Sequence, residues 1–102
     1  MRAYENDLEL LTNFFSGYFH EDWDCDASSP AEVAASYIRT ASPQDVRLLH
    51  EAIIHYVECI REDADLEKKL FSELGCYYLP SGDRLSARNW LLSIADLLGK
   101  AV

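Results

Sequence analysis

Two groups of residues in this chain combine side chains that can bind a metal ion. The first group alternates along a short acidic stretch: His20, Asp22 and Asp24. The second recurs at four-residue intervals and would share one side of a helix: Glu51, His55 and Cys59. Loop acids beside one histidine, as in the first group, are common by chance. Imidazole and thiolate are zinc ligands, but a structural site needs about four ligands in closed geometry, and nothing obvious completes the second group. We therefore expect no metal site and no cofactor.

Nucleophilic catalysis has no better support. Cys25 lies between Asp24 and Asp26, whose negative charges disfavour the thiolate that a cysteine nucleophile requires. Two Ser-Gly pairs begin at Ser16 and Ser81, but neither has the pattern of a nucleophile elbow, and no glycine-rich phosphate loop precedes a helix. The three cysteines match no zinc or redox spacing, which suits a reducing cytosol. An enzyme, whether a hydrolase or a metalloenzyme, is the weakest hypothesis, and we expect no catalytic activity.

The composition indicates one folded domain that spans residues 1–102. With 49% hydrophobic and 12% aromatic residues, the chain can bury a single core and differs from disordered proteins. No apolar run approaches the roughly 18–20 residues of a membrane span, and the acidic N-terminus lacks the apolar segment of a signal peptide. We expect a cytoplasmic protein that does not contact a membrane.

The chain is acidic, and its charge is unevenly distributed. The net charge is −9, and residues 1–26 contribute −6 of it through seven acids and one arginine. Direct binding to nucleic acid needs a basic surface, so this charge disfavours it. The acidity either only keeps the protein soluble or steers it toward a basic partner, such as a nuclease whose own surface attracts phosphate.

The spacing of the apolar residues predicts an all-α fold, a compact single-domain bundle of about five helices. These helices are expected near residues 6–20, 30–40, 43–62, 65–74 and 86–98. The acid-rich stretch 22–28 is expected to form an ordered loop held by Trp23. Residues 76–79 are expected to form an extended connector, with an isolated strand as the alternative.

Particular residues mark where these helices begin and end. Three serines stand where they can cap a helix: Ser29, Ser42 and Ser86. Asp63 or Asp65 is expected to cap the fourth helix, because each lies just before its apolar pattern begins. Gly75 and Gly99 are expected to end the fourth and fifth helices, since glycine readily adopts the left-handed conformation of a helix C-terminus.

The densest group of aromatic residues, in the stretch 14–26, is expected to anchor the core. Carboxylates are almost never buried without a partner, so the acids of the same stretch must face solvent. The predicted core comprises Tyr18, Phe19, Trp23, Tyr37, Leu49, Ile53, Leu70, Trp90 and Ile94.

The same aromatic stretch carries a family resemblance. Residues 18–23, Tyr-Phe-His-Glu-Asp-Trp, resemble the tyrosine-phenylalanine…aspartate-tryptophan signature of the immunity proteins of bacterial contact-dependent growth inhibition systems. Residues 74–78, Leu-Gly-Cys-Tyr-Tyr, and 90–94, Trp-Leu-Leu-Ser-Ile, are similar to a second block of that family. The resemblance implies a protein that binds and neutralises the C-terminal domain of a cognate toxin. A small acidic helical adaptor or regulator, unrelated to toxins, would share the composition and is the alternative.

Two acidic surfaces are the candidate contacts with such a partner. The first follows the first helix: Glu21, Asp22, Asp24 and Asp26. The second lies along the third helix: Glu51, His55, Glu58 and Glu62. If the toxin is a nuclease, these side chains would meet the lysines and arginines that hold its substrate's phosphates. Leu92, which points away from Trp90 on the last helix, is the candidate for an apolar contact instead.

Overall fold

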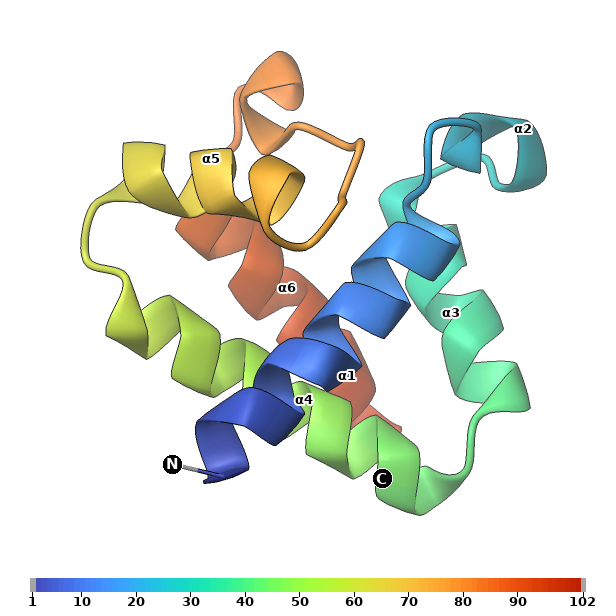
Figure 1. Ribbon diagram of the computed structural model, residues 1–102. Coiled ribbons are helices and arrows are strands. Elements are labelled where there is room, and N and C mark those ends of the chain that lie inside the picture. The colour runs from blue at the N-terminus through green and yellow to red at the C-terminus, as the bar shows by residue number, and fades with distance from the viewer. Residues whose placement is uncertain (1, 102) are drawn as a thin grey trace.

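Figure 1 shows a computed structural model of the chain, which describes the backbone of residues 2–101 and the side chains of residues 7–25 and 27–101. The described elements are α1 (Arg2–Tyr18), α2 (Trp23–Asp26), α3 (Pro30–Thr40), α4 (Pro43–Cys59), α5 (Asp63–Ser72), the 3-10 helix η1 (Pro80–Asp83) and α6 (Ala87–Lys100). The predicted all-α class is confirmed: all five expected helices are present, and no strand occurs within residues 2–101. None of the described helices is long and apolar enough to cross a membrane.

Two short helical elements were not predicted, α2 and η1. The stretch 22–28 was expected to be an ordered loop, but a turn of helix forms at Trp23–Asp26 within it. Its backbone closes locally, because Cys25 N–H donates to the Asp22 carbonyl over 2.9 Å and Ala27 N–H donates to the Trp23 carbonyl over 3.2 Å. One short turn carries no apolar periodicity, so the sequence pattern did not reveal it.

The predicted serine caps are all formed. Ser29 Oγ accepts from Glu32 N–H at 3.2 Å, and Ser42 and Ser86 make the same bond three residues ahead at 3.1 and 3.0 Å. Each bond satisfies an N–H group that has no partner within its helix. Gly75 follows the end of α5 with φ of 73°, a left-handed conformation that glycine adopts without strain. The expectation for Gly75 is thereby confirmed.

Two predictions about the residues that cap or end a helix are wrong. Glu62 occupies the N-cap of α5 without a side-chain bond, so neither Asp63 nor Asp65 caps that helix. The Asp63 carboxylate instead accepts the first N–H groups of α6, from Ala87 at 3.0 Å and Arg88 at 2.8 Å. These contacts span more than twenty residues of sequence, so local capping rules do not find them.

Gly99 also differs from its prediction, because it lies within α6 rather than after its end. A Cβ atom at this position would come 2.9 Å from Cε1 of His50 on α4. The His50 ring is held in place there, with Nδ1 lying 2.6 Å from the Ala95 carbonyl oxygen. Glycine at 99 therefore provides the space in which α4 and α6 approach one another.

The last helix, α6, lies at the centre of the fold and packs against α3, α4, α5 and η1, while α1 packs across α4 (Figure 1). Arg88, near the start of α6, joins it to the end of α4. Its guanidinium donates to the carbonyl oxygens of Val57, Ile60 and Arg61 at 3.0, 2.7 and 2.9 Å. Together with Asp63, Arg88 ties the α4–α5 corner to the central helix.

An aromatic cluster fills the middle of the core. Phe15 and Phe19 are fully buried, and the rings of Trp90 and Tyr78 lie beside them. Six predicted core residues are buried: Phe19, Leu49, Ile53, Leu70, Trp90 and Ile94. The other three are only partly buried and pack against the edge of this core: Tyr18, Trp23 and Tyr37. Trp23 is thus an edge residue that closes the cluster, and the buried anchor of the 14–26 stretch is formed by its phenylalanines.

Candidate functional site

The acidic residues after α1 lie on an exposed turn, and we call Glu21, Asp22 and Asp24 the α2 patch. All three side chains are exposed. Asp22 occupies the N-cap position of α2, but its carboxylate makes no capping bond. Its backbone N–H donates instead to Nδ1 of His20 over 3.1 Å. The side chain of Asp26, the fourth predicted member, lies outside the described residues.

The second predicted group is placed on the outer side of α4 and just beyond it; we call Glu51, His55, Glu58 and Glu62 the α4 patch. All four side chains are exposed, and Glu62 follows the helix at the N-cap of α5. His55 is joined to α1, because its Nδ1 lies 3.1 Å from Oδ2 of Asp7. The α4 patch therefore borders the line along which α1 and α4 meet.

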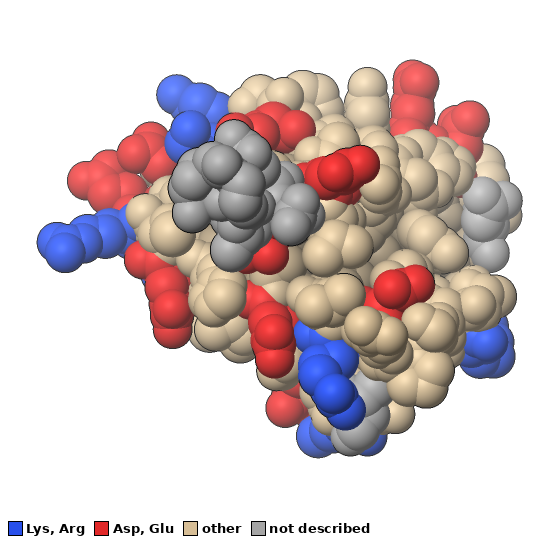
Figure 2. Space-filling model, turned by 60° about the horizontal axis from the view of Figure 1, so that its bottom comes forward, with Lys and Arg blue, Asp and Glu red and all other residues tan. Residues whose placement is uncertain are grey.

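The two patches form separate surfaces. Figure 1 places α2 at the upper right and the C-terminal half of α4 at the lower left. Figure 2 turns the underside of that view forward and shows acidic side chains spread over this face, with the visible lysines and arginines mostly toward its outline. A partner that docks through one patch would not automatically cover the other.

A groove runs between α1 and α4, and we call it the α1–α4 groove. Its volume is about 540 Å³. The lining residues come from both helices: Asp7, Glu9, Leu10, Asn13, Leu48, Glu51 and His55. The two leucines give it apolar surface, and the carboxylates border that surface. Two members of the α4 patch, Glu51 and His55, are thus part of a concave site.

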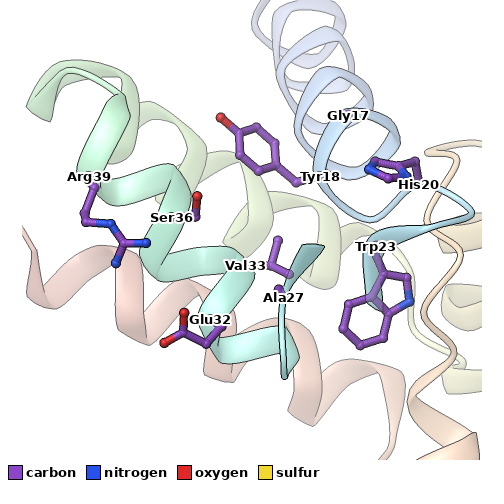
Figure 3. Close-up of a pocket in the computed structure, with 9 residues that line it drawn as sticks. All are labelled: Gly17, Tyr18, His20, Trp23, Ala27, Glu32, Val33, Ser36 and Arg39. Atoms are coloured by element: carbon purple, nitrogen blue, oxygen red, sulfur yellow. The ribbon is translucent and has the colours of Figure 1, made fainter. Parts of the chain in front are cut away.

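A second, smaller pocket of about 280 Å³ lies between the end of α1, α2 and α3 (Figure 3). Tyr18, His20 and Trp23 face α3 across it, where Val33 and Ser36 lie. The same helix contributes Glu32 and Arg39, so this pocket carries charges of both signs. Its chemistry is mixed, in contrast to the acidic α1–α4 groove.

The two groups of residues that could bind a metal, at which no metal site was expected, do not form ligand clusters in the described part of the chain. Within the described residues, no three His, Cys, Asp or Glu side chains come together as metal ligands. One ring nitrogen of each histidine concerned is already engaged: Nδ1 of His20 accepts the Asp22 N–H, and Nδ1 of His55 lies beside Asp7. The patches carry negative charge, and the groove adds apolar surface. Both are properties through which a protein surface can bind a partner.

Comparison with known proteins now assigns the chain to a family. The family model for CdiI immunity proteins matches residues 7–98. The chain belongs to the CdiI immunity protein family. This membership confirms the resemblance seen in residues 18–23, 74–78 and 90–94.

A solved structure shares the fold of this CdiI family member. The crystal structure of a CdiA-CT/CdiI complex from Y. kristensenii 33638 contains a chain that matches with a TM-score of 0.82 and 21% sequence identity. The match covers 90% of the present chain and 98% of that chain. No curated protein matches the sequence. At this identity the structural match supports the helical fold and its arrangement.

Sequence reasoning did not find the α1 side of the groove in this CdiI family member. Asp7, Glu9 and Leu10 belong to α1, whereas the predicted contact residues nearest to them in the sequence follow that helix. One signal was available: Leu48 falls outside the buried apolar side of α4, on the side of the helix that carries Glu51 and His55. It is 42% exposed and lines the groove, so an apolar residue on a polar helix face was the available clue.

Proposed function

We propose that this chain binds and neutralises the C-terminal toxin domain of a contact-dependent growth inhibition system, as a cytoplasmic inhibitor without catalytic activity of its own. The observation that carries the proposal is the family match over residues 7–98, nearly the whole chain. The chain in the Y. kristensenii crystal structure, which has the same fold, comes from a complex between CdiA-CT and CdiI.

We further propose that the toxin domain is basic, of nuclease type, and is bound through the acidic surface of the chain. The net charge of −9 and the exposed carboxylates of both patches support this partner chemistry. Opposite charges on two proteins mainly raise the association rate, and carboxylates that meet phosphate-binding lysines and arginines would block the approach of nucleic acid. The chain itself then needs no contact with nucleic acid.

Co-expression tests the neutralisation. The toxin domain is taken from the protein encoded next to this chain, upstream, and is induced in cells with or without the chain. We expect growth arrest without the chain, normal growth with it, and no rescue from an unrelated toxin domain used as the control. If the chain neither binds this toxin domain nor restores growth, the proposed function is wrong.

The nuclease assignment has its own measurement. Cellular RNA and DNA are examined after induction of the toxin domain, and the association rate of the purified proteins is measured at rising salt. We expect degraded nucleic acid in unprotected cells and a rate that falls as salt screens the charges. Intact nucleic acid together with growth arrest would exclude the nuclease type while leaving neutralisation in place.

A further inference from the structure

The floor of the α1–α4 groove is apolar and accessible. Leu48 is 42% exposed and Leu10 is partly buried beside it. The buried apolar residues of α4, such as Val46 and Leu49, face the core, so Leu48 is available to a partner rather than to the fold. An accessible apolar strip flanked by polar groups is a common feature of binding surfaces.

The rim of the groove is negatively charged on both sides. Glu9 of α1 and Glu51 of α4 are exposed, and within the described part of the chain neither carboxylate has a hydrogen bond or an ion pair. Asp7, with 22% of its side chain exposed, is held by His55 on the opposite helix. None of the described lining residues is a lysine or an arginine. The groove therefore favours a cation.

The α2 patch lacks this combination. Its three acids lie on an exposed turn, and the pocket nearest to them contains Arg39 and His20. A cationic side chain that entered that pocket would meet the Arg39 guanidinium as well as the Glu32 carboxylate, whereas one that entered the α1–α4 groove would meet carboxylates and, among the described lining residues, no lysine or arginine. Exposed ion pairs on a convex surface are weak, because water and salt screen them.

We infer that the α1–α4 groove receives a basic side chain, arginine or lysine, of the toxin domain. The aliphatic stem of that side chain lies on Leu10 and Leu48, and its charged end lies between Glu9 and Glu51. Long basic side chains suit such a site, since they bury an apolar stem while the charged end stays near carboxylates. This inference rests on the proposed function and specifies which surface performs it.

Three double variants with equal loss of charge test the rim. The groove variant carries Glu9→Gln and Glu51→Gln. The α2 variant carries Glu21→Gln and Asp24→Asn, and the remote control carries Asp65→Asn and Asp96→Asn, at two exposed positions outside the groove and both patches. Binding of the full-length chains to the neighbouring toxin domain is measured, with circular dichroism as the check on folding. We expect the Kd of the groove variant to rise about tenfold or more, and that of the remote control to rise less than about threefold.

Two single variants test the floor. Leu48→Ser removes the apolar contact in the groove, and Leu92→Ser is the matched control, because Leu92 is a leucine of similar exposure (38%) on α6. Both residues are exposed enough that the fold should tolerate the change. We expect Leu48→Ser to speed dissociation about fivefold or more and Leu92→Ser to leave it unchanged.

The outcomes separate the inference from the proposed function. If the parent chain protects against the toxin but the groove variants bind like the parent, the groove inference is wrong and neutralisation stands. Loss of binding only in the α2 variant, or only in Leu92→Ser, would likewise place the contact elsewhere. If the parent chain does not bind the toxin domain at all, both proposals fail together.

Discussion

Cys76 and Tyr78 lie two residues apart in the extended segment after α5, and both are buried. The Cys76 thiol donates to the Tyr78 carbonyl at 3.4 Å, and the Tyr78 hydroxyl donates to Oδ2 of Asp83 at 2.7 Å. Burial raises the pKa of the Cys76 thiol to about 12. Burial, followed by the bond to Asp83, also raises the pKa of Tyr78. Both groups therefore stay protonated in the folded chain at neutral pH.

Alkaline pH is expected to destabilise the fold through Cys76. Its stabilising effect is complete below the unfolded pKa of about 8.5 and is lost as the pH rises toward the folded pKa, because only the unfolded chain releases the proton. For the folded pKa of about 12, the loss between pH 7.5 and 10 is about 1–2 kcal/mol.

Urea unfolding under reducing conditions at the two pH values measures this effect. The decrease should be smaller by that amount in Cys76→Ala, and unchanged in the control Cys59→Ala, whose thiol is exposed. An equal decrease in the parent and in Cys76→Ala would contradict the assignment to this thiol.

At the scale of the helices, the contact between α4 and α6 depends on a missing side chain. Gly99 lies opposite His50, whose Nδ1 is within hydrogen-bond distance of the Ala95 carbonyl oxygen. Within a helix, alanine is favoured over glycine by about 1 kcal/mol, so Gly99 lowers the helix propensity of α6. Its missing side chain leaves room for the His50 ring.

The coupling of Gly99 and His50 can be measured with four proteins: the parent, Gly99→Ala, His50→Ala and the double variant. Gly99→Ala alone should give no gain or a loss in stability, since the new methyl group displaces the imidazole from its hydrogen bond. In the His50→Ala background the same change should stabilise by about 0.5–1 kcal/mol. Urea unfolding of all four gives the coupling energy. Purely additive effects would contradict the prediction, because they would show that the His50 ring makes room for the methyl group without any loss of stability.

The helices themselves could be predicted from the sequence because their signals are local. Ser29, Ser42 and Ser86 each form a bond three residues ahead, and the core spacing repeats within each helix. The features that could not be predicted depend on distant partners. Asp63 binds the start of α6, and Gly99 faces α4.

The candidate site also has features that local sequence patterns predict and features that depend on distant partners. The outward placement of Glu51, His55 and Glu58 follows from helical spacing and is confirmed. The α1–α4 groove exists only because two helices cross, and no pattern within either one reveals Glu9 as its other rim. Which acidic surface contacts the toxin domain stays a prediction.

At the scale of the whole molecule, the aromatic cluster joins the two ends of the sequence. Phe19 lies with its ring 5.3 Å from that of Trp90, and its carbonyl accepts the Tyr77 N–H at 2.7 Å. Trp23 covers this junction, with ring distances of 5.8 Å to Phe19 and 5.6 Å to Tyr78. Trp23, together with Ala27 just after α2, packs the turn that bears the α2 patch against the core.

Trp23→Ala should lower the melting temperature, but less than Phe19→Ala. A fully buried phenylalanine typically contributes about 3–5 kcal/mol. The partly buried Trp23 should contribute about 2 kcal/mol, a decrease of roughly 8–16 °C for a domain of this size. Thermal melts followed by circular dichroism test the order of the two effects. A Trp23→Ala chain that melts like the parent would show that the turn stands free of the core.

The positions of the cysteines allow the surface that a partner covers to be mapped by alkylation of the unaltered chain. Cys25 lies on α2 beside Asp24, Cys59 lies one turn beyond His55 at the end of α4, and both are exposed, while Cys76 is sealed in the core. An alkylating reagent will therefore label the native chain at two places, one next to each acidic patch. In the complex, whichever thiol is shielded marks the covered side, so mass spectrometry of the unaltered protein can locate the partner.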